Sequence, residues 1–232
     1  MKDAKVCTYC EKPATSADHV PPKLLFAKPR PELITVPSCL SCNQSASLDD
    51  EYFRAVIAME EKAGEHSEAK RIHATIWRSL QKPRKKRFRH ALLSSIREVD
   101  HTSPGGIYLG KARAYNVDLT RLTRVVERIT RGLFLHHTGR RLPLHCTIDA
   151  FSPRGLSGKD STAPQTMLEL VEQTRANQMY TIGNDVFCYR YAVSAEQKNS
   201  SVWVFVVYQG MSFISLTRDL AQGIAPESPV DK

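Results

Sequence analysis

Cys7-Thr8-Tyr9-Cys10 and Cys39-Leu40-Ser41-Cys42 are two C-x2-C pairs, and Asp18-His19-Val20-Pro21-Pro22 lies between them. Two such pairs suit one tetrahedral Zn²⁺, because each short turn presents two sulfur atoms to the same ion and the intervening chain folds back on it. The four cysteines Cys7, Cys10, Cys39 and Cys42 therefore predict a structural zinc site. This site organises the first part of the chain.

The segment between the two cysteine pairs predicts a strand that carries the Asp-His pair. Pro21 and Pro22 favour extended backbone and exclude helix, which places His19 on or beside a strand. A second strand is expected near residues 33–36, followed by the second cysteine pair and a helix. Asn43 lies at the start of that helix, and we expect it near Asp18 because the zinc ion ties both cysteine pairs together.

In this order the four cysteines, Asp18, His19 and Asn43 resemble the HNH endonucleases, in an endonuclease VII-like arrangement. The resemblance covers residues 1–50. It implies a zinc-stapled, treble-clef-like ββα-metal core. It also implies that Asp18 and Asn43 bind a catalytic Mg²⁺ or Mn²⁺, and that His19 is the general base in a hydrolysis leaving 5′-phosphate and 3′-hydroxyl ends.

Those implied roles suit the chemistry of the residues. Oxygen ligands such as those of Asp18 and Asn43 fit a hard cation that keeps several waters, and such a cation offsets charge on a scissile phosphate. A neutral imidazole such as that of His19 is a suitable base near neutral pH. The sequence therefore predicts a metal-dependent endonuclease that hydrolyses phosphodiester bonds, most simply in DNA.

Two departures from the family pattern leave alternatives open. Residues 35–38 lack the asparagine that many members have before the second cysteine pair, and Ala46 stands where a further ligand would be convenient. Asp49, Asp50 and Glu51 either supply that ligand or cap a helix starting near residue 50, and capping is the favoured interpretation. A non-catalytic zinc module that binds nucleic acid or protein is the alternative function.

Composition favours a nucleic-acid partner. The chain has 33 Lys and Arg residues against 24 Asp and Glu residues, a net charge of +9, which fits a polyanion such as double-stranded DNA. Apolar runs are too short for a membrane span, and the first residues are polar, so we expect a cytoplasmic protein with no membrane partner. Cys146 and Cys188 are predicted to be buried free thiols.

Two basic segments are candidate contacts with nucleic acid. The run from Lys82 to His90 is either a solvated linker or a phosphate-contacting segment, and the upstream motif favours contact through its central cations, Arg84, Lys85, Lys86 and Arg87. Residues 119–138 predict an amphipathic helix. Its arginine stripe either follows a phosphate backbone or is a solvated face; the stripe comprises Arg121, Arg124, Arg128 and Arg131.

The predicted fold is α+β in four parts. Residues 1–64 form the zinc unit, and residues 65–103 form a helical, basic connector. Residues 104–222 form an antiparallel sheet with flanking helices, whose role is unassigned and which can bind a protein partner. Residues 223–232 form a flexible tail.

Overall fold

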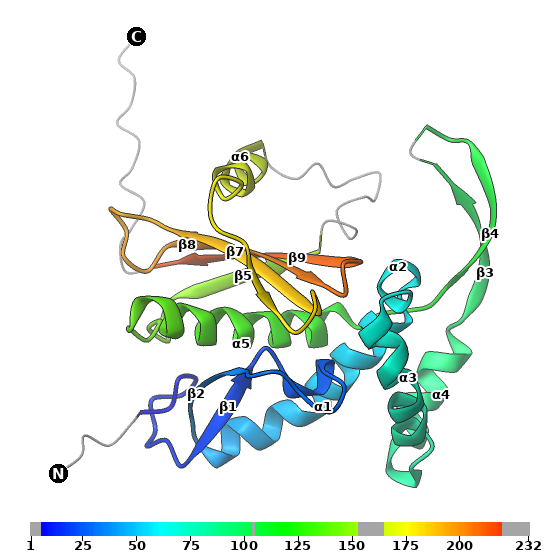
Figure 1. Ribbon diagram of the computed structural model, residues 1–232, viewed down its shortest axis with the longest axis horizontal. Helices are drawn as coiled ribbons and strands as arrows, with labels where there is room; N and C mark the ends of the chain where they lie inside the picture. Colours follow the sequence, from blue (N-terminus) through cyan, green and yellow to red (C-terminus); the bar gives the residue numbers. More distant parts are fainter. Residues whose placement is uncertain (1–5, 104, 153–164, 220–232) are drawn as a thin grey trace.

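The long helix α5 (Leu119–Thr138) is central to the computed structural model, which describes residues 6–103, 105–152 and 165–219. A five-stranded antiparallel sheet lies on one side of α5, and the N-terminal hairpin with helix α1 (Leu40–Met59) lies on the other (Figure 1). The fold is mixed α+β, as predicted. The predicted tail 223–232 lies outside the described residues.

The N-terminal hairpin pairs β1 (Ser16–Val20) with β2 (Ile34–Ser38), and the short 3-10 turn η1 (Lys23–Leu25) lies in the connection. Asp18 and His19 are thus in a strand, as the two prolines predicted. Helix α1 begins at Leu40, because Cys39 caps it by accepting the backbone N–H of Cys42.

The prediction of a helix starting near residue 50 is wrong, since α1 runs without a break from residue 40 to 59. Asp49, Asp50 and Glu51 therefore lie in the middle of a helix rather than at its cap. Their carboxylates are available for contacts with neighbouring elements instead of with unsatisfied backbone N–H groups.

Short helices and a projecting hairpin follow α1. Figure 1 shows the hairpin standing away from the body of the molecule, and Ile107, Tyr108 and Leu109 near its tip are exposed. The helical elements are α2 (Glu61–Gly64), α3 (Ser67–Leu80), η2 (Pro83–Lys85) and α4 (Lys86–Ser94), and the hairpin strands are β3 (Arg97–Thr102) and β4 (Tyr108–Ala114).

The sheet has the strand order β5-β9-β8-β7-β6, with every neighbouring pair antiparallel. Its strands are β5 (Thr147–Phe151), β6 (Tyr180–Ile182), β7 (Phe187–Val193), β8 (Ser201–Val207) and β9 (Met211–Arg218), and helix α6 (Gln165–Gln173) lies between β5 and β6 in sequence. The antiparallel pairing predicted for the C-terminal part is confirmed.

Helix α5 has clear start and stop signals. The side chain of Asp118 accepts the backbone N–H of Arg121 at the start, and Gly139 ends the helix in the left-handed conformation, with φ of 68°. The predicted apolar stripe is buried, and it comprises Leu122, Val125, Val126, Ile129 and Leu133. Because α5 lies between two layers, this stripe holds the N-terminal hairpin and the sheet together.

The hydrophobic core is continuous across the predicted domain boundaries. One cluster of buried residues includes Val20 of β1, Leu133 of α5 and residues of β7, β8 and β9. The rings of Phe53 in α1 and Phe213 in β9 stack with centroids 5.5 Å apart. The zinc unit and the C-terminal sheet are thus packed against each other rather than joined by an exposed linker.

Gly210 gives a direct test of this packing. A Cβ atom at this position, in the β8–β9 turn, would lie 2.3 Å from the backbone nitrogen of Ala63 in α2. Because backbone cannot move aside as a side chain does, Gly210→Ala should lower the free energy of unfolding by about 2–3 kcal/mol. Urea denaturation measures the change. Gly105→Ala, where the added carbon meets ordinary contact distances, should change it little, and equal effects would contradict the close packing.

Candidate metal centre and the adjoining polar cluster

The four predicted zinc ligands come together. The sulfur atoms of Cys7, Cys10, Cys39 and Cys42 all lie within 4.8 Å of one another, and those of Cys10 and Cys39 are 3.5 Å apart. Sulfur atoms bound to one tetrahedral zinc ion lie about 3.8 Å apart. The group can therefore hold a structural Zn²⁺. Cys7 and Cys10 come from the N-terminal turn, and Cys39 and Cys42 come from the start of α1.

The surroundings of Cys7 and Cys39 suit thiolate ligands, because the pKa of each of these two thiols is lowered. Burial by itself raises the pKa of Cys7, but hydrogen bonds from backbone N–H groups outweigh that effect and lower this pKa to about 6. Sγ of Cys7 accepts the backbone N–H of Tyr9, and Sγ of Cys39 accepts that of Cys42. These N–H groups stabilise negative charge on sulfur, which is the form that binds zinc.

Asp18 is buried and bound by the protein itself. Its Oδ2 accepts the hydroxyl of Tyr9 at 2.9 Å and forms an ion pair with the guanidinium of Arg128. Its Oδ1 accepts the backbone N–H of His19 at 3.0 Å. The Arg128 guanidinium supplies a positive charge to this carboxylate, and both oxygens of Asp18 are engaged by donors of the protein itself.

Arg128 connects α5 to the zinc unit. Besides its pair with Asp18, it donates to the carbonyl oxygen of Cys42 at 3.0 Å, and its guanidinium lies 4.2 Å from the ring centroid of Tyr9. Such stacking of a guanidinium on an aromatic ring is attractive. The sequence did not identify Tyr9 as a partner of Asp18, although its place inside the first C-x2-C pair fixes it beside the metal centre.

His19 and Asn43 have different surroundings from Asp18. Consecutive residues of a strand point to opposite faces, and accordingly Asp18 is buried against α5 whereas His19 is half-buried. The amide of Asn43 donates to the carbonyl oxygen of Ala17 at 3.0 Å, which ties α1 to β1. Arg128 links Asp18 to Cys42, the residue before Asn43.

The imidazole of His19 lies in a positively charged environment. Among the described residues, no hydrogen bond to its ring is recorded. Burial is the main cause that lowers the pKa of His19 below its ordinary value, and the positive charge of Lys23 lowers this pKa further. The negative charge of Asp18 partly offsets the decrease, and Arg30 adds a smaller lowering effect. His19 is therefore neutral at neutral pH, the protonation state required of a general base.

Asp50 is a further member of the polar cluster. Burial raises its pKa to about 7; the positive charge of Arg128 opposes the increase, and the carboxylates of Asp18 and Asp49 add to it. Asp50 of α1 and Asp18 of β1 thus share one neighbourhood, a proximity that the sequence analysis did not predict. Asp50 is the better placed of the acids proposed as an additional ligand, because Asp49 is engaged elsewhere.

The arginine stripe of α5 contacts the protein. Arg121 and Arg124 both pair with Asp49, each with an Nε–Oδ distance of 2.7 Å. Arg131 donates to backbone carbonyl oxygens of residues 142–146. The stripe is therefore not a simple solvated face, because the partners of these side chains lie on α1 and in residues 142–146. Contact of these arginines with nucleic acid stays a prediction.

The basic run at 82–90 is divided by the fold. Lys85 is buried and pairs with Glu51, so its charge is used inside the protein. Arg84, Lys86 and Arg87 are exposed. Contact of these three with nucleic acid stays a prediction.

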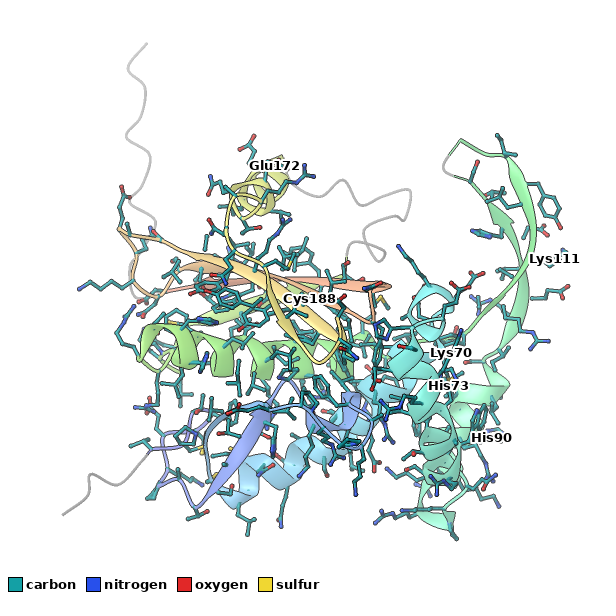
Figure 2. All side chains as sticks on the ribbon, viewed as in Figure 1. Lys70, His73, His90, Lys111, Glu172 and Cys188 are labelled. Atoms are coloured by element: carbon teal, nitrogen blue, oxygen red, sulfur yellow. The ribbon has the colours of Figure 1, made fainter. Side chains whose placement is uncertain are left out.

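Other histidines and cysteines lie away from the zinc centre. His73 on α3 contacts the carbonyl oxygen of Ala58 at 2.9 Å, and His90 lies on α4 (Figure 2). Cys146 is buried, as predicted, whereas Cys188 on β7 is only half-buried. A second group of possible ligands, formed by Cys146 with His145 and Asp219, already contains a 3.0 Å contact between the imidazole and the carboxylate.

Comparison of the chain with protein-family models, with curated proteins and with solved structures finds no match. The likeness to HNH endonucleases thus depends on the residues of the N-terminal segment. Within the part of the chain that the structure describes, none of the helices combines the length and the apolar character needed to cross a membrane.

Proposed function

We propose that this chain is a metal-dependent endonuclease of the HNH type, which hydrolyses phosphodiester bonds in DNA with His19 as the general base. The observation that carries the proposal is the association of a four-cysteine group with a hairpin and helix that bear Asp18, His19 and Asn43 in the order of that family. The hydrogen bond from Asn43 to the backbone of β1 supports it, because it fixes the start of α1 against the strand of His19.

The chemistry proposed for His19 is proton abstraction. A neutral, half-buried imidazole without a recorded ring partner among the described residues can accept a proton from a water molecule that attacks phosphorus. The proposed ligands of the divalent cation, Asp18 and Asn43, offer oxygen atoms of the class that Mg²⁺ prefers. Binding at Asp18 requires the Arg128 guanidinium to withdraw from that carboxylate.

A zinc-containing nucleic-acid-binding protein without cleavage is the second candidate. The engagement of Asp18 by Arg128 and Tyr9 favours it, because a carboxylate bound by two protein donors is suited to holding α5 against the zinc unit. This candidate gives His19 no role. The two candidates differ in whether the protein cleaves nucleic acid. The decisive measurement is therefore cleavage rather than binding affinity.

Plasmid cleavage separates the two candidates. Zinc-loaded protein should nick or linearise supercoiled DNA in Mn²⁺ or Mg²⁺, with EDTA-treated reactions as controls, and end-labelling should find 5′-phosphate and 3′-hydroxyl ends. RNA and single-stranded DNA are included as alternative substrates. Protein that retains its zinc and binds DNA, yet cleaves none of these substrates with either cation, would overturn the endonuclease assignment and leave the binding protein.

A further inference from the structure

A cationic cavity lies between the β1–β2 connection, α1 and α3. Its volume is about 430 Å³. Five of its lining residues are cationic and none of the described lining residues is acidic; the five are Lys28, Arg30, Arg54, Arg71 and Arg78. Gathering so many like charges around one space costs electrostatic energy unless an anion enters it.

Arg54 is the unusual member of this group. Its side chain belongs to a residue that is only 6% exposed, and its Nε is buried without a hydrogen-bond partner. No ion pair of its guanidinium is recorded among the described residues. Burial lowers its pKa, the nearby Tyr208 partly offsets this, and the charge of Arg30 adds to the lowering. A buried Nε–H of a cationic side chain without an acceptor is unfavourable, so a missing anionic partner is indicated.

The other arginines of the cavity are held in place by the protein. Arg71 pairs with Glu68 and donates to the carbonyl oxygen of Lys28 at 2.9 Å. Arg30 donates through Nε to the carbonyl oxygen of Lys23 at 3.0 Å. These contacts fix two cationic groups at the wall without neutralising Arg54. The cavity is therefore preorganised around the one guanidinium that lacks a partner.

We propose that this cavity binds a phosphate group of the nucleic-acid backbone, with Arg54 as its innermost contact; the assignment of the phosphate to nucleic acid rests on the proposed endonuclease function. Guanidinium groups offer several N–H donors in a fixed plane that match phosphate oxygens. Arg30 belongs both to the wall of the cavity and to the surroundings of His19. We therefore expect a phosphate held there to neighbour the scissile phosphate, which is attacked by the water molecule that His19 deprotonates.

Binding of inorganic phosphate tests the cavity without reference to cleavage. Calorimetry at constant ionic strength and without divalent cations should detect binding to the zinc-loaded wild-type protein, and Arg54→Met should weaken it by about 30-fold or more. Arg175→Met removes the same charge from an exposed side chain that pairs with Glu172 and should leave the affinity unchanged. No binding to wild type, or equal loss in both variants, would overturn the phosphate site.

Thermal unfolding separates a binding role from a structural one. Since Arg54 is buried and unpaired, Arg54→Met should not lower the melting temperature in the absence of phosphate. If that variant does not fold, Arg30→Met replaces it, because Arg30 lies at the same cavity. If the folded variant, Arg54→Met or its replacement Arg30→Met, still binds phosphate as tightly as wild type does, the assignment is contradicted.

Duplex DNA identifies the source of the phosphate. Without divalent cations, Arg54→Met should weaken DNA binding measured by anisotropy. The slope of log affinity against log salt concentration should decrease in magnitude by about one, the value expected for the loss of one phosphate contact. If phosphate binding is lost while DNA binding is unchanged, the cavity takes free phosphate and the backbone assignment falls. If Arg54 affects both but the protein never cleaves, the endonuclease proposal fails and the phosphate site stands.

Discussion

Replacing His19 by alanine should reduce DNA cleavage by about 10²–10⁴-fold, the contribution typical of a general base. Zinc content, the free energy of unfolding and DNA affinity should stay close to those of wild type, because the ring makes no recorded hydrogen bond among the described residues and lies half-exposed on β1. His101→Ala, a matched change at an exposed position in β3, should leave cleavage intact. Single-turnover cleavage of labelled DNA measures the loss.

The pH dependence of the same reaction gives an independent check. A general base acts in its neutral form, so kcat/KM should rise with pH through the pKa of His19 and then level off. Burial, and after it Lys23, lower that pKa, so the rise should occur below the ordinary histidine value of about 6.5. Undiminished cleavage by the alanine variant would remove His19 from the mechanism, whatever the pH profile.

Cys39→Ser should have the largest effect on stability. Cys39 belongs to the four-cysteine group and also caps α1, so its loss removes a metal ligand and a helix cap together. Because zinc binding energy in such sites is folding energy, we expect loss of the zinc ion and a decrease of at least about 3 kcal/mol in the free energy of unfolding. Hydrogen exchange should show that β1 and β2 lose protection first.

Cys188→Ser is the matched control. This thiol is half-buried on β7 and is not part of the four-cysteine group, so the variant should keep its zinc and most of its stability. Metal analysis of wild-type protein purified without chelator should find zinc close to one ion per chain. Zinc-free wild-type protein that is fully folded would contradict a structural metal site.

Local sequence signals predicted much of the fold because the responsible interactions are local. The prolines after His19 predicted an extended segment, and Asp118 and Gly139 marked the ends of α5. In contrast, the acidic stretch at residues 49–51 was misread as the start of a helix. The helix begins instead at Leu40, and the sulfur atom of the preceding Cys39 takes the capping role usually given to an oxygen.

The environment of each charged side chain was not predictable in the same way. Arg128 was grouped with three other arginines because they share one face of a helix, and that periodicity is correct. Which partner faces each arginine depends on β1 and α1, which lie far earlier in the chain; Arg128 meets Asp18 of β1, and Arg124 meets Asp49 of α1. Helical spacing contains no information about such a neighbour.

The sequence by itself determined the four-cysteine group, the strand of Asp18 and His19, the amphipathic character of α5 and the antiparallel C-terminal sheet, since spacing, turn residues and periodicity are properties of nearby residues. Only the tertiary structure decided that Asp18 is held by Arg128 and that Arg54 lies buried without a partner beside other cations. Those features arise when α5 packs against β1 and α3 packs against α1, and electrostatic interactions between distant segments depend on that packing.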